Sequence, residues 1–311
     1  MIKRYAMNKI FVSTLVFGLL VLFYLVPSPS FDMEVVEEEN KKGKENVVYL
    51  LDEDNYVSRV ISYYEESDIE ALIREKIKIL INGDKSLGKF YSLIPKNTIL
   101  KDVKVEKDSV YLNFNKEFLS VNKYLEESMI EAIVFSLTEI NGINNVYINV
   151  DSKKLTKLPN SGREIPYPLT RSFGINKKYD LNSLNELDKT IVYFVKTCDE
   201  VEYYVPVTKY VNDQREKVKI IIDELSSSQV YDSNLMSYLD SNVKLEAATV
   251  EDDVLHLNFN QNIMSSLDDE PILEEVIYTI ALSIQDNYDV SQVSFEVENQ
   301  EIYKTVLKTL D

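Results

Sequence analysis

The chain has 311 residues, of which 45% are hydrophobic and only seven are glycine, and its formal net charge is -18. This length and apolar content predict about two packed domains and argue against a fibrous or wholly disordered chain. The excess of 52 acidic over 34 basic residues would repel phosphate backbones, so no nucleic-acid binding is expected.

The first element expected in chain order is a membrane anchor. Residues 10–26 form an uncharged apolar run that follows a basic leader ending at Lys9. The run is near the short limit of a bilayer-spanning helix, and the basic leader favours an N-terminus left in the cytoplasm. We therefore expect a signal anchor or transmembrane helix within residues 1–30, which holds the chain in the cytoplasmic membrane as a single-pass protein. A secretory signal that is cleaved ahead of Phe31 is the alternative.

A polar stalk is expected to follow the anchor. Residues 31–46 are dense in charge, and such a stretch cannot bury enough apolar surface to fold. With the N-terminus inside, everything beyond the stalk would lie on the extracytoplasmic side of the membrane.

The sequence after the expected stalk contains an internal repeat. Four segments recur in the same order, and one of them, Leu-Asn-Phe-Asn, recurs unchanged. The matched pairs are 48–51 with 192–195, 74–81 with 215–222, 112–115 with 257–260, and 146–150 with 293–297. We therefore expect two copies of one domain, over 47–151 and 189–311, joined by a linker over 152–188. Leu169, Phe173 and Ile175 could fix parts of this linker to a domain.

Each copy reads as strands grouped in pairs around two helices. Leu255, Leu257 and Phe259 alternate with polar residues, as in a strand with one buried face, and Val218, Ile221 and further apolar residues recur at helical spacing. For the second copy we expect strands over 191–195, 203–207, 243–250, 254–260 and 292–298, and helices over 211–225 and 270–285. The fold class is therefore α+β: in each copy a largely antiparallel sheet has two helices packed on one face.

The duplication also tests candidate catalytic residues, because each can be compared with its counterpart. His256 is the only histidine and corresponds to Tyr111, while Cys198 is the only cysteine and has no cysteine counterpart. Residues 52–55 resemble a calcium loop in composition, but they lack the glycine and the bidentate glutamate of that loop. We therefore expect no enzyme, no cofactor and no metal site, with a carboxylate-based hydrolase as the remaining catalytic alternative.

The best-matched polar residues of the copies form a candidate assembly surface. They lie at the ends of two strands and at the expected starts of two helices. These residues are Asn113, Asn115, Asn258 and Asn260, with Arg74 and Arg215. In the competing interpretation the phenylalanine between each pair of asparagines anchors its strand while the asparagines begin a turn.

The ordered set of motifs resembles the GerM domain, the sporulation and spore germination domain, present in tandem. The resemblance covers nearly all of residues 46–300. It rests on the matched strands and helices, and on the segments Tyr204-Val205-Pro206-Val207, Ile94-Pro95-Lys96-Asn97-Thr98, Ser136-Leu137-Thr138-Glu139-Ile140 and Pro168-Leu169-Thr170-Arg171. Two features depart from the pattern: no lipoprotein cysteine is present, and the second copy has 285–288 where a Thr-Glu-Ile helix end is expected.

The resemblance implies a non-enzymatic protein at the outer face of the cytoplasmic membrane of a spore-forming bacterium. Tandem members are linked to assembly of the complex that joins mother cell and forespore, and the domain is similar to ring-building modules of secretion machines. The expected partners are envelope or sporulation-complex proteins, or further copies of the chain in a homo-oligomer. A binding module for cell-wall material or for a sensor's extracellular domain is the alternative function.

Overall fold

A computed structural model describes residues 44–64, 68–83, 87–181, 187–198, 201–227, 234–264 and 271–307. The expected anchor over 10–26 and most of the expected stalk over 31–46 lie outside the described residues. The last three residues of that stalk are described, and they begin strand β1 (Lys44–Leu51). In the part of the chain that is described, no helix has the length and apolar character needed to cross a bilayer.

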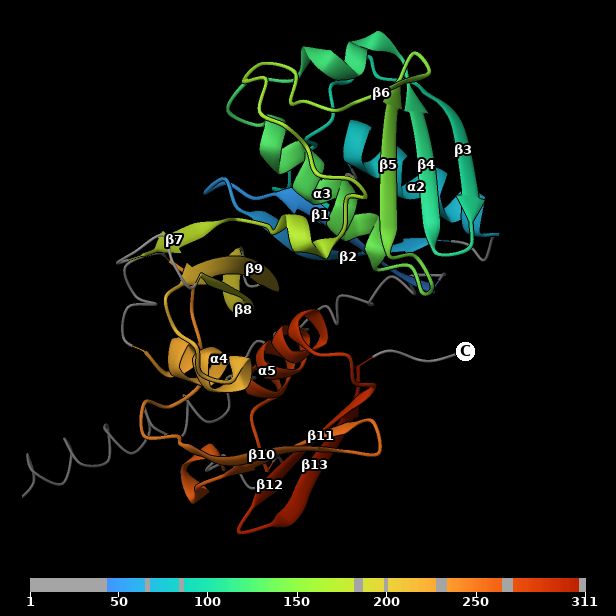
Figure 1. Cartoon of the computed structure of the whole chain (residues 1–311). Coiled ribbons are helices and arrows are strands. Elements are labelled where there is room, and N and C mark those ends of the chain that lie inside the picture. Colours follow the sequence, from blue (N-terminus) through green and yellow to red (C-terminus); the bar gives the residue numbers. More distant parts are fainter. Residues whose placement is uncertain are drawn as a thin grey trace, which may run out of the picture. The chain divides into compact units, whose positions relative to one another are not determined.

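Both copies have the same order of elements: a hairpin, a helix, a second hairpin, a second helix and a closing strand pair (Figure 1). In the first copy these are β1, β2 (Val57–Tyr64), α2 (Ile69–Asn82), β3 (Leu100–Glu106), β4 (Ser109–Phe114), α3 (Glu126–Thr138), β5 (Asn145–Val150) and β6 (Lys153–Lys154). In the second they are β8 (Asp188–Cys198), β9 (Val201–Val211), α4 (Lys217–Ser226), β10 (Leu245–Glu251), β11 (Val254–Phe259), α5 (Glu274–Asn287), β12 (Gln292–Val297) and β13 (Gln300–Val306).

Local sequence accounts for several of these elements. Helix α2 begins where the Asp68 side chain accepts a hydrogen bond from the Ala71 N–H, and it ends at Gly83, whose φ of 72° suits glycine. Strand β4 alternates between half-buried residues and the fully buried Val110 and Leu112, as expected for a strand with one face on the core.

The strands form three sheets rather than one for each copy. The first hairpins of both copies share a central sheet, in which β1 pairs with β2, β8 pairs with β9, and Arg59 of β2 faces Tyr204 of β9. The remaining strands form two outer sheets in the orders β3-β4-β5-β6 and β10-β11-β12-β13. Each outer sheet is mixed, because a helix connects β4 to β5 and β11 to β12 and brings each pair together in parallel.

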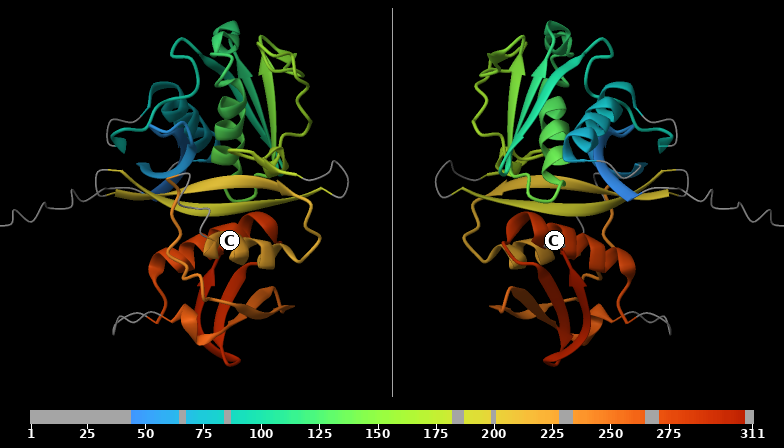
Figure 2. Two further views of the ribbon diagram at one scale, coloured as in Figure 1. Left: turned by 90° about the vertical axis from the view of Figure 1, so that its left-hand side faces the viewer. Right: turned by 90° about the vertical axis from the view of Figure 1, so that its right-hand side faces the viewer.

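The helices lie between these sheets. Helices α2 and α3 occupy the space between the shared sheet and the first outer sheet, and α4 and α5 lie across the shared sheet from them (Figures 1 and 2). Helix α3 is therefore enclosed on two sides, and only Glu127 and Ser128 of its residues are not buried. The α+β prediction with two helices on one face describes each outer sheet, but it did not anticipate the separate, shared sheet.

Some expected boundaries were wrong, and the expected linker contains a strand. Helix α4 begins at Lys217 rather than at 211, because β9 pairs with β8 as far as Val211. The segment expected to be a linker, with parts of it fixed to a domain, contributes strand β7 (Lys178–Asp180), which pairs in parallel with β9. Leu169 and Ile175 of the same segment are fully buried. Pairing with distant strands thus determines structure where the local pattern is weak.

Candidate functional site

The asparagines that end β4 and β11 have partners within the chain. The Asn115 side-chain oxygen accepts a hydrogen bond from the Ile99 N–H at 2.8 Å, and its amide nitrogen donates to the Asn97 carbonyl at 3.1 Å. Asn260 repeats the first of these bonds in the second copy by accepting from the Lys244 N–H at 3.0 Å. Both residues therefore hold the loop that enters the neighbouring edge strand.

The other two predicted asparagines hold the turn that follows the closing strand. Asn113 accepts a hydrogen bond from the Ser152 N–H at 2.9 Å, and Asn258 accepts one from the Asn299 N–H at 3.0 Å. All four asparagines thus have a role in the fold. Their role as an assembly surface stays a prediction.

The two predicted arginines differ between the copies. Arg74 lies inside α2, which begins at Ile69, whereas Arg215 lies ahead of α4, so the expectation that both arginines start a helix was wrong for the first copy. Arg215 forms ion pairs with Asp213 at 2.7 Å and with Asp223 at 2.6 Å. The side chain of Arg74 forms no ion pair with any described residue.

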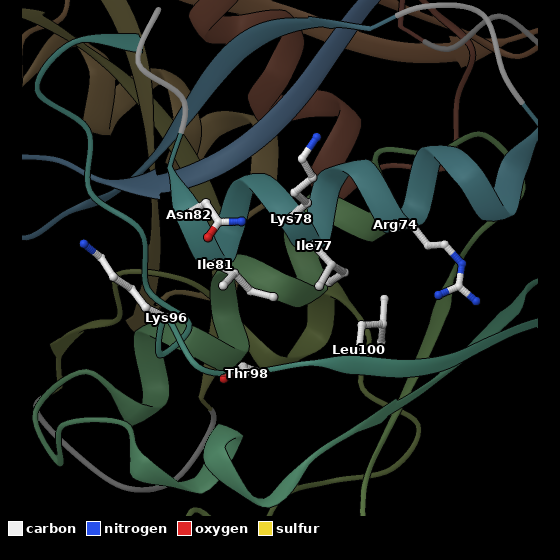
Figure 3. Close-up of a pocket in the computed structure, with 8 residues that line it drawn as sticks. All are labelled: Arg74, Ile77, Lys78, Ile81, Asn82, Lys96, Thr98 and Leu100. Atoms are coloured by element: carbon white, nitrogen blue, oxygen red, sulfur yellow. The ribbon is translucent and has the colours of Figure 1, made fainter.

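Arg74 lines a pocket of about 240 Å³ between α2 and the start of β3 (Figure 3). Lys78 of α2 and Lys96 of the loop that leads into β3 also line the pocket, and Thr98 and Leu100 form the opposite wall. Among the described residues that line the pocket, three are cationic and none carries a carboxylate, in a chain with a net charge of -18.

A buried polar cluster joins the two copies. The hydroxyl groups of Tyr49 in β1 and Tyr193 in β8 lie 3.0 Å apart. The main-chain N–H of each tyrosine donates to a serine hydroxyl of its own copy at 2.9 Å, Tyr49 to Ser136 and Tyr193 to Ser283. Each tyrosine hydroxyl also bonds a carboxylate of its own copy at 2.7 Å. The cluster therefore has approximate twofold symmetry.

Arg171, from the segment between the copies, connects the two carboxylates. Its guanidinium donates to Glu139 at 2.5 Å and to Asp286, and its face packs on the Phe135 ring with the guanidinium carbon 4.7 Å from the ring centroid. Burial alone would raise the pKa of Glu139, but the charges of Arg171 and Arg59 and the hydrogen bonds outweigh it and lower this pKa to about 2. Burial raises the pKa of Asp286 despite Arg171, and the charge of Glu139 adds to that effect.

A second ion cluster joins the ends of β1 and β8. Lys196 donates to Asp52 at 2.8 Å and forms an ion pair with Asp54 at 2.6 Å, and the Tyr203 hydroxyl donates to Asp52 at 3.1 Å. Burial alone would lower the pKa of Lys196, but its hydrogen bonds to the two carboxylates outweigh burial and raise it. The acidic loop over 52–55, which resembles a calcium site in composition, therefore binds a lysine of the other copy.

The segment between the copies adds a third set of contacts. The Asn176 amide accepts from the Val57 N–H at 2.9 Å and donates to the Val57 and Pro206 carbonyls at 2.8 Å, so it contacts both copies. The next residue, Lys177, donates to Glu127 and Glu131 of α3 at 2.7 Å. The shared sheet and these three sets of contacts make the two copies one unit.

The buried Lys76 lies close to this junction. Its ammonium donates to the Val47 carbonyl. Burial lowers its pKa to about 7, and the charges of Arg59 and Arg171 act in the same direction, against the opposing effect of Glu139.

The two side chains considered for nucleophilic catalysis have separate partners. The Nδ1 atom of His256 lies 2.6 Å from Glu296, and the Cys198 thiol lies 3.9 Å from Glu53. Among the residues that the structure describes, no cluster of His, Cys, Asp and Glu has metal-binding geometry.

The residues of the buried cluster between the copies lie in segments that the sequence pattern singles out, but the pattern does not indicate that they form a site. Tyr49 and Tyr193 lie in matched segments, and Arg171 ends one of the motifs of the family resemblance. By sequence pattern alone, residues 285–288 depart from the expected helix end. Asp286 nevertheless follows Ser283 as Glu139 follows Ser136, so the carboxylate is retained.

Comparison with known proteins identifies the two copies. A family model described as sporulation and spore germination matches residues 47–156 and 191–303. The chain is 27% identical over 263 residues to the spore germination protein GerM of Bacillus subtilis. The aligned region covers 81% of this chain and 71% of that protein. The solved tandem GerMN domains of the sporulation protein GerM from Bacillus subtilis superpose with a TM-score of 0.74 at 26% identity, which covers 83% of this chain and 92% of that one. The chain therefore belongs to the sporulation and spore germination family and carries its domain in tandem.

Proposed function

We propose that this chain supports sporulation or spore germination as a non-enzymatic protein, anchored in the cytoplasmic membrane with its two domains on the extracytoplasmic side. Its activity is protein–protein assembly of an envelope complex between mother cell and forespore. Family membership and the likeness to the Bacillus subtilis spore germination protein GerM support the process. The apolar run over 10–26 behind a basic leader supports the anchor.

The observation that carries the assembly role is the junction between the copies. The shared sheet and the buried cluster of Arg171, Glu139 and Asp286 hold the copies in one arrangement. A module that is rigid before it binds loses less conformational entropy when a partner docks. The two outer sheets lie on either side of the junction, so one chain could contact two neighbours (Figure 1).

The contacts of the charged groups support a role without catalysis. Catalytic carboxylates need access to a substrate and a pKa suited to proton transfer. The side chains of Glu139 and Asp286 are 10% and 2% exposed, and both bind Arg171. The buried Asp52 is likewise committed to Lys196. These groups join the copies instead of facing a cleft.

Crosslinking of the full-length chain in sporulating cells tests this proposal. The expected result is recovery of envelope or sporulation-complex proteins, and their loss when residues 10–26 are replaced by a cleavable secretory signal. Recovery of cell-wall material or of a sensor's extracellular domain instead would favour the alternative binding module. Normal spores and normal germination after deletion of the gene would contradict the proposal.

A further inference from the structure

We propose that the pocket between α2 and β3 in the first copy binds an acidic and partly apolar segment of a partner protein. The proposal rests on the proposed function as a protein-binding module, and it names the chemistry of one contact. The first observation is charge: Arg74, Lys78 and Lys96 line the pocket, with the ammonium groups of the two lysines at its rim, where they point outward (Figure 3). A guanidinium presents paired N–H donors that match a carboxylate, and an ammonium adds attraction without fixed geometry.

The positive charge of the pocket is only partly neutralised. Lys78 pairs with Glu75 at 3.0 Å, but both side chains are well exposed and such pairs are weak. Arg74 and Lys96 form no ion pair with a described residue. The carbonyl end of α2 contributes a partial negative charge near Asn82. Among the described residues, three full positive charges outweigh these two opposing contributions.

The second observation is a buried hydroxyl that lacks a partner. Thr98 lines the pocket and is 6% exposed, and its Oγ1 atom has no hydrogen-bond partner among the described residues. An unsatisfied buried hydroxyl costs free energy, because it has lost its bonds to water. Because this Oγ1 atom is itself closed off from solvent, a ligand group would supply the missing partner only by displacing the side chains that cover the atom.

The apolar residues of the pocket indicate a protein segment and not a small anion. Ile77 and Ile81 of α2 and Leu100 of β3 contribute to the lining. Phosphate gains nothing from such a surface, whereas a peptide can place an apolar side chain there and a neighbouring carboxylate on Arg74 or Lys96. The net charge of -18 would repel the same peptide from most of the remaining surface, which favours a single docking position.

The second copy provides an internal comparison. The hollow beside Arg215 lies next to Asp180 of β7 and Val211 of β9 and not between α4 and β10; its lining includes Asp213, Asp223 and Glu224, and two of its carboxylates bind the arginine. In the repeat, Asp223 corresponds to Asn82, since 74–81 matches 215–222. A neutral amide thus stands in the first copy where the second has a carboxylate. The acidic-segment site is therefore a property of the first copy alone.

Selection from a random twelve-residue peptide library on the full-length chain in detergent micelles tests the inference. Peptides that also bind the Asn82→Asp variant are removed, because the added carboxylate should repel the proposed ligand. We expect the retained peptides to combine Asp or Glu with large apolar residues. A retained peptide should bind Arg74→Gln about tenfold to 100-fold more weakly in fluorescence anisotropy, the loss expected for one charged hydrogen bond. Arg215→Gln, the matched change in the second copy, should bind within about twofold of the wild type.

Three results would overturn the inference. The first is no enrichment over Asn82→Asp, or enrichment of basic or neutral peptides. The second is equal binding by wild type and Arg74→Gln. The third is displacement of the peptide by inorganic phosphate at the concentration at which the peptide itself binds, which would identify a small-anion site. The selection needs no sporulating cell, so its failure is distinguishable from failure of the proposed function, which is judged on spores.

Discussion

Replacement of Arg171 by methionine should destabilise the folded protein through the two carboxylates that it leaves behind. Methionine retains an apolar stem against Phe135 but removes the guanidinium that binds Glu139 and Asp286. These carboxylates are 10% and 2% exposed, so water cannot replace the lost partner fully. Removing one partner of a buried pair costs about 3–5 kcal/mol. The expected loss in the free energy of unfolding is therefore about 3–5 kcal/mol near pH 7.5.

The loss should shrink in acid. In the wild type, the pKa of Glu139 is lowered from 4.5 to about 2, so this group stabilises the fold above pH 4.5 and its contribution disappears as the pH falls toward 2. Without Arg171 the pKa of both carboxylates rises. A group with a raised pKa in the folded state destabilises the fold as the pH rises through that value. Both trends make the difference between variant and wild type smaller at pH 4 than at pH 7.5.

Urea unfolding, followed by circular dichroism and by tyrosine fluorescence, measures this difference, since the chain has 21 tyrosines and no tryptophan. Arg215→Met is the matched control, because this arginine is 53% exposed and its pairs with Asp213 and Asp223 should contribute only about 0–1 kcal/mol. The reasoning is refuted if Arg171→Met costs no more than Arg215→Met at pH 7.5, or if its cost does not depend on pH.

Three further predictions concern single side chains, each measured by the same unfolding experiment. Burial lowers the pKa of Lys76 from 10.5 to about 7 in the folded state, so between these two pH values the unfolded chain binds one more proton than the folded one. The free energy of unfolding of the wild type should therefore rise by about 1.4 kcal/mol per pH unit above pH 7, relative to Lys76→Met. Equal pH dependence of the two free energies would contradict this. Tyr193→Phe removes the donor to Asp286 and should cost about 1–3 kcal/mol, whereas Tyr303→Phe, on the exposed strand β13, should cost almost nothing. Asn115→Ala should cost about 1–3 kcal/mol and more than Asn113→Ala, because only Asn115 is buried; equal costs would argue against its structural role.

The repeat and its elements could be predicted because they follow from local patterns. The alternation of Leu255, Leu257 and Phe259 corresponds to the buried face of β11. The shared central sheet could not be predicted in this way, since β2 and β9 meet at the single pair Arg59 and Tyr204. One signal was available: residues 48–51 and 191–195 are continuous apolar runs, which are typical of strands buried on both faces.

The candidate site was less accessible from sequence than the fold. The repeat predicts the matched asparagines as surface residues available to a partner, but in the structure their side-chain oxygens accept hydrogen bonds from neighbouring loops and turns. Arg171 lies between the copies and therefore has no counterpart that a repeat comparison could reveal. The pocket beside Arg74 forms because α2 and the loop that carries Lys96 lie side by side in the fold. A periodic sequence pattern predicts each element but not how the two pack together.

Spore formation by the organism that encodes this chain tests the central claim most directly. Heat-resistant spores and their germination are counted in a strain that lacks the gene, and in the same strain after the wild-type gene or a gene without residues 10–26 is restored. A role in sporulation or germination as a membrane-anchored assembly protein predicts a clear defect that only the wild-type gene repairs. Normal spore numbers and normal germination in the strain without the gene would contradict it.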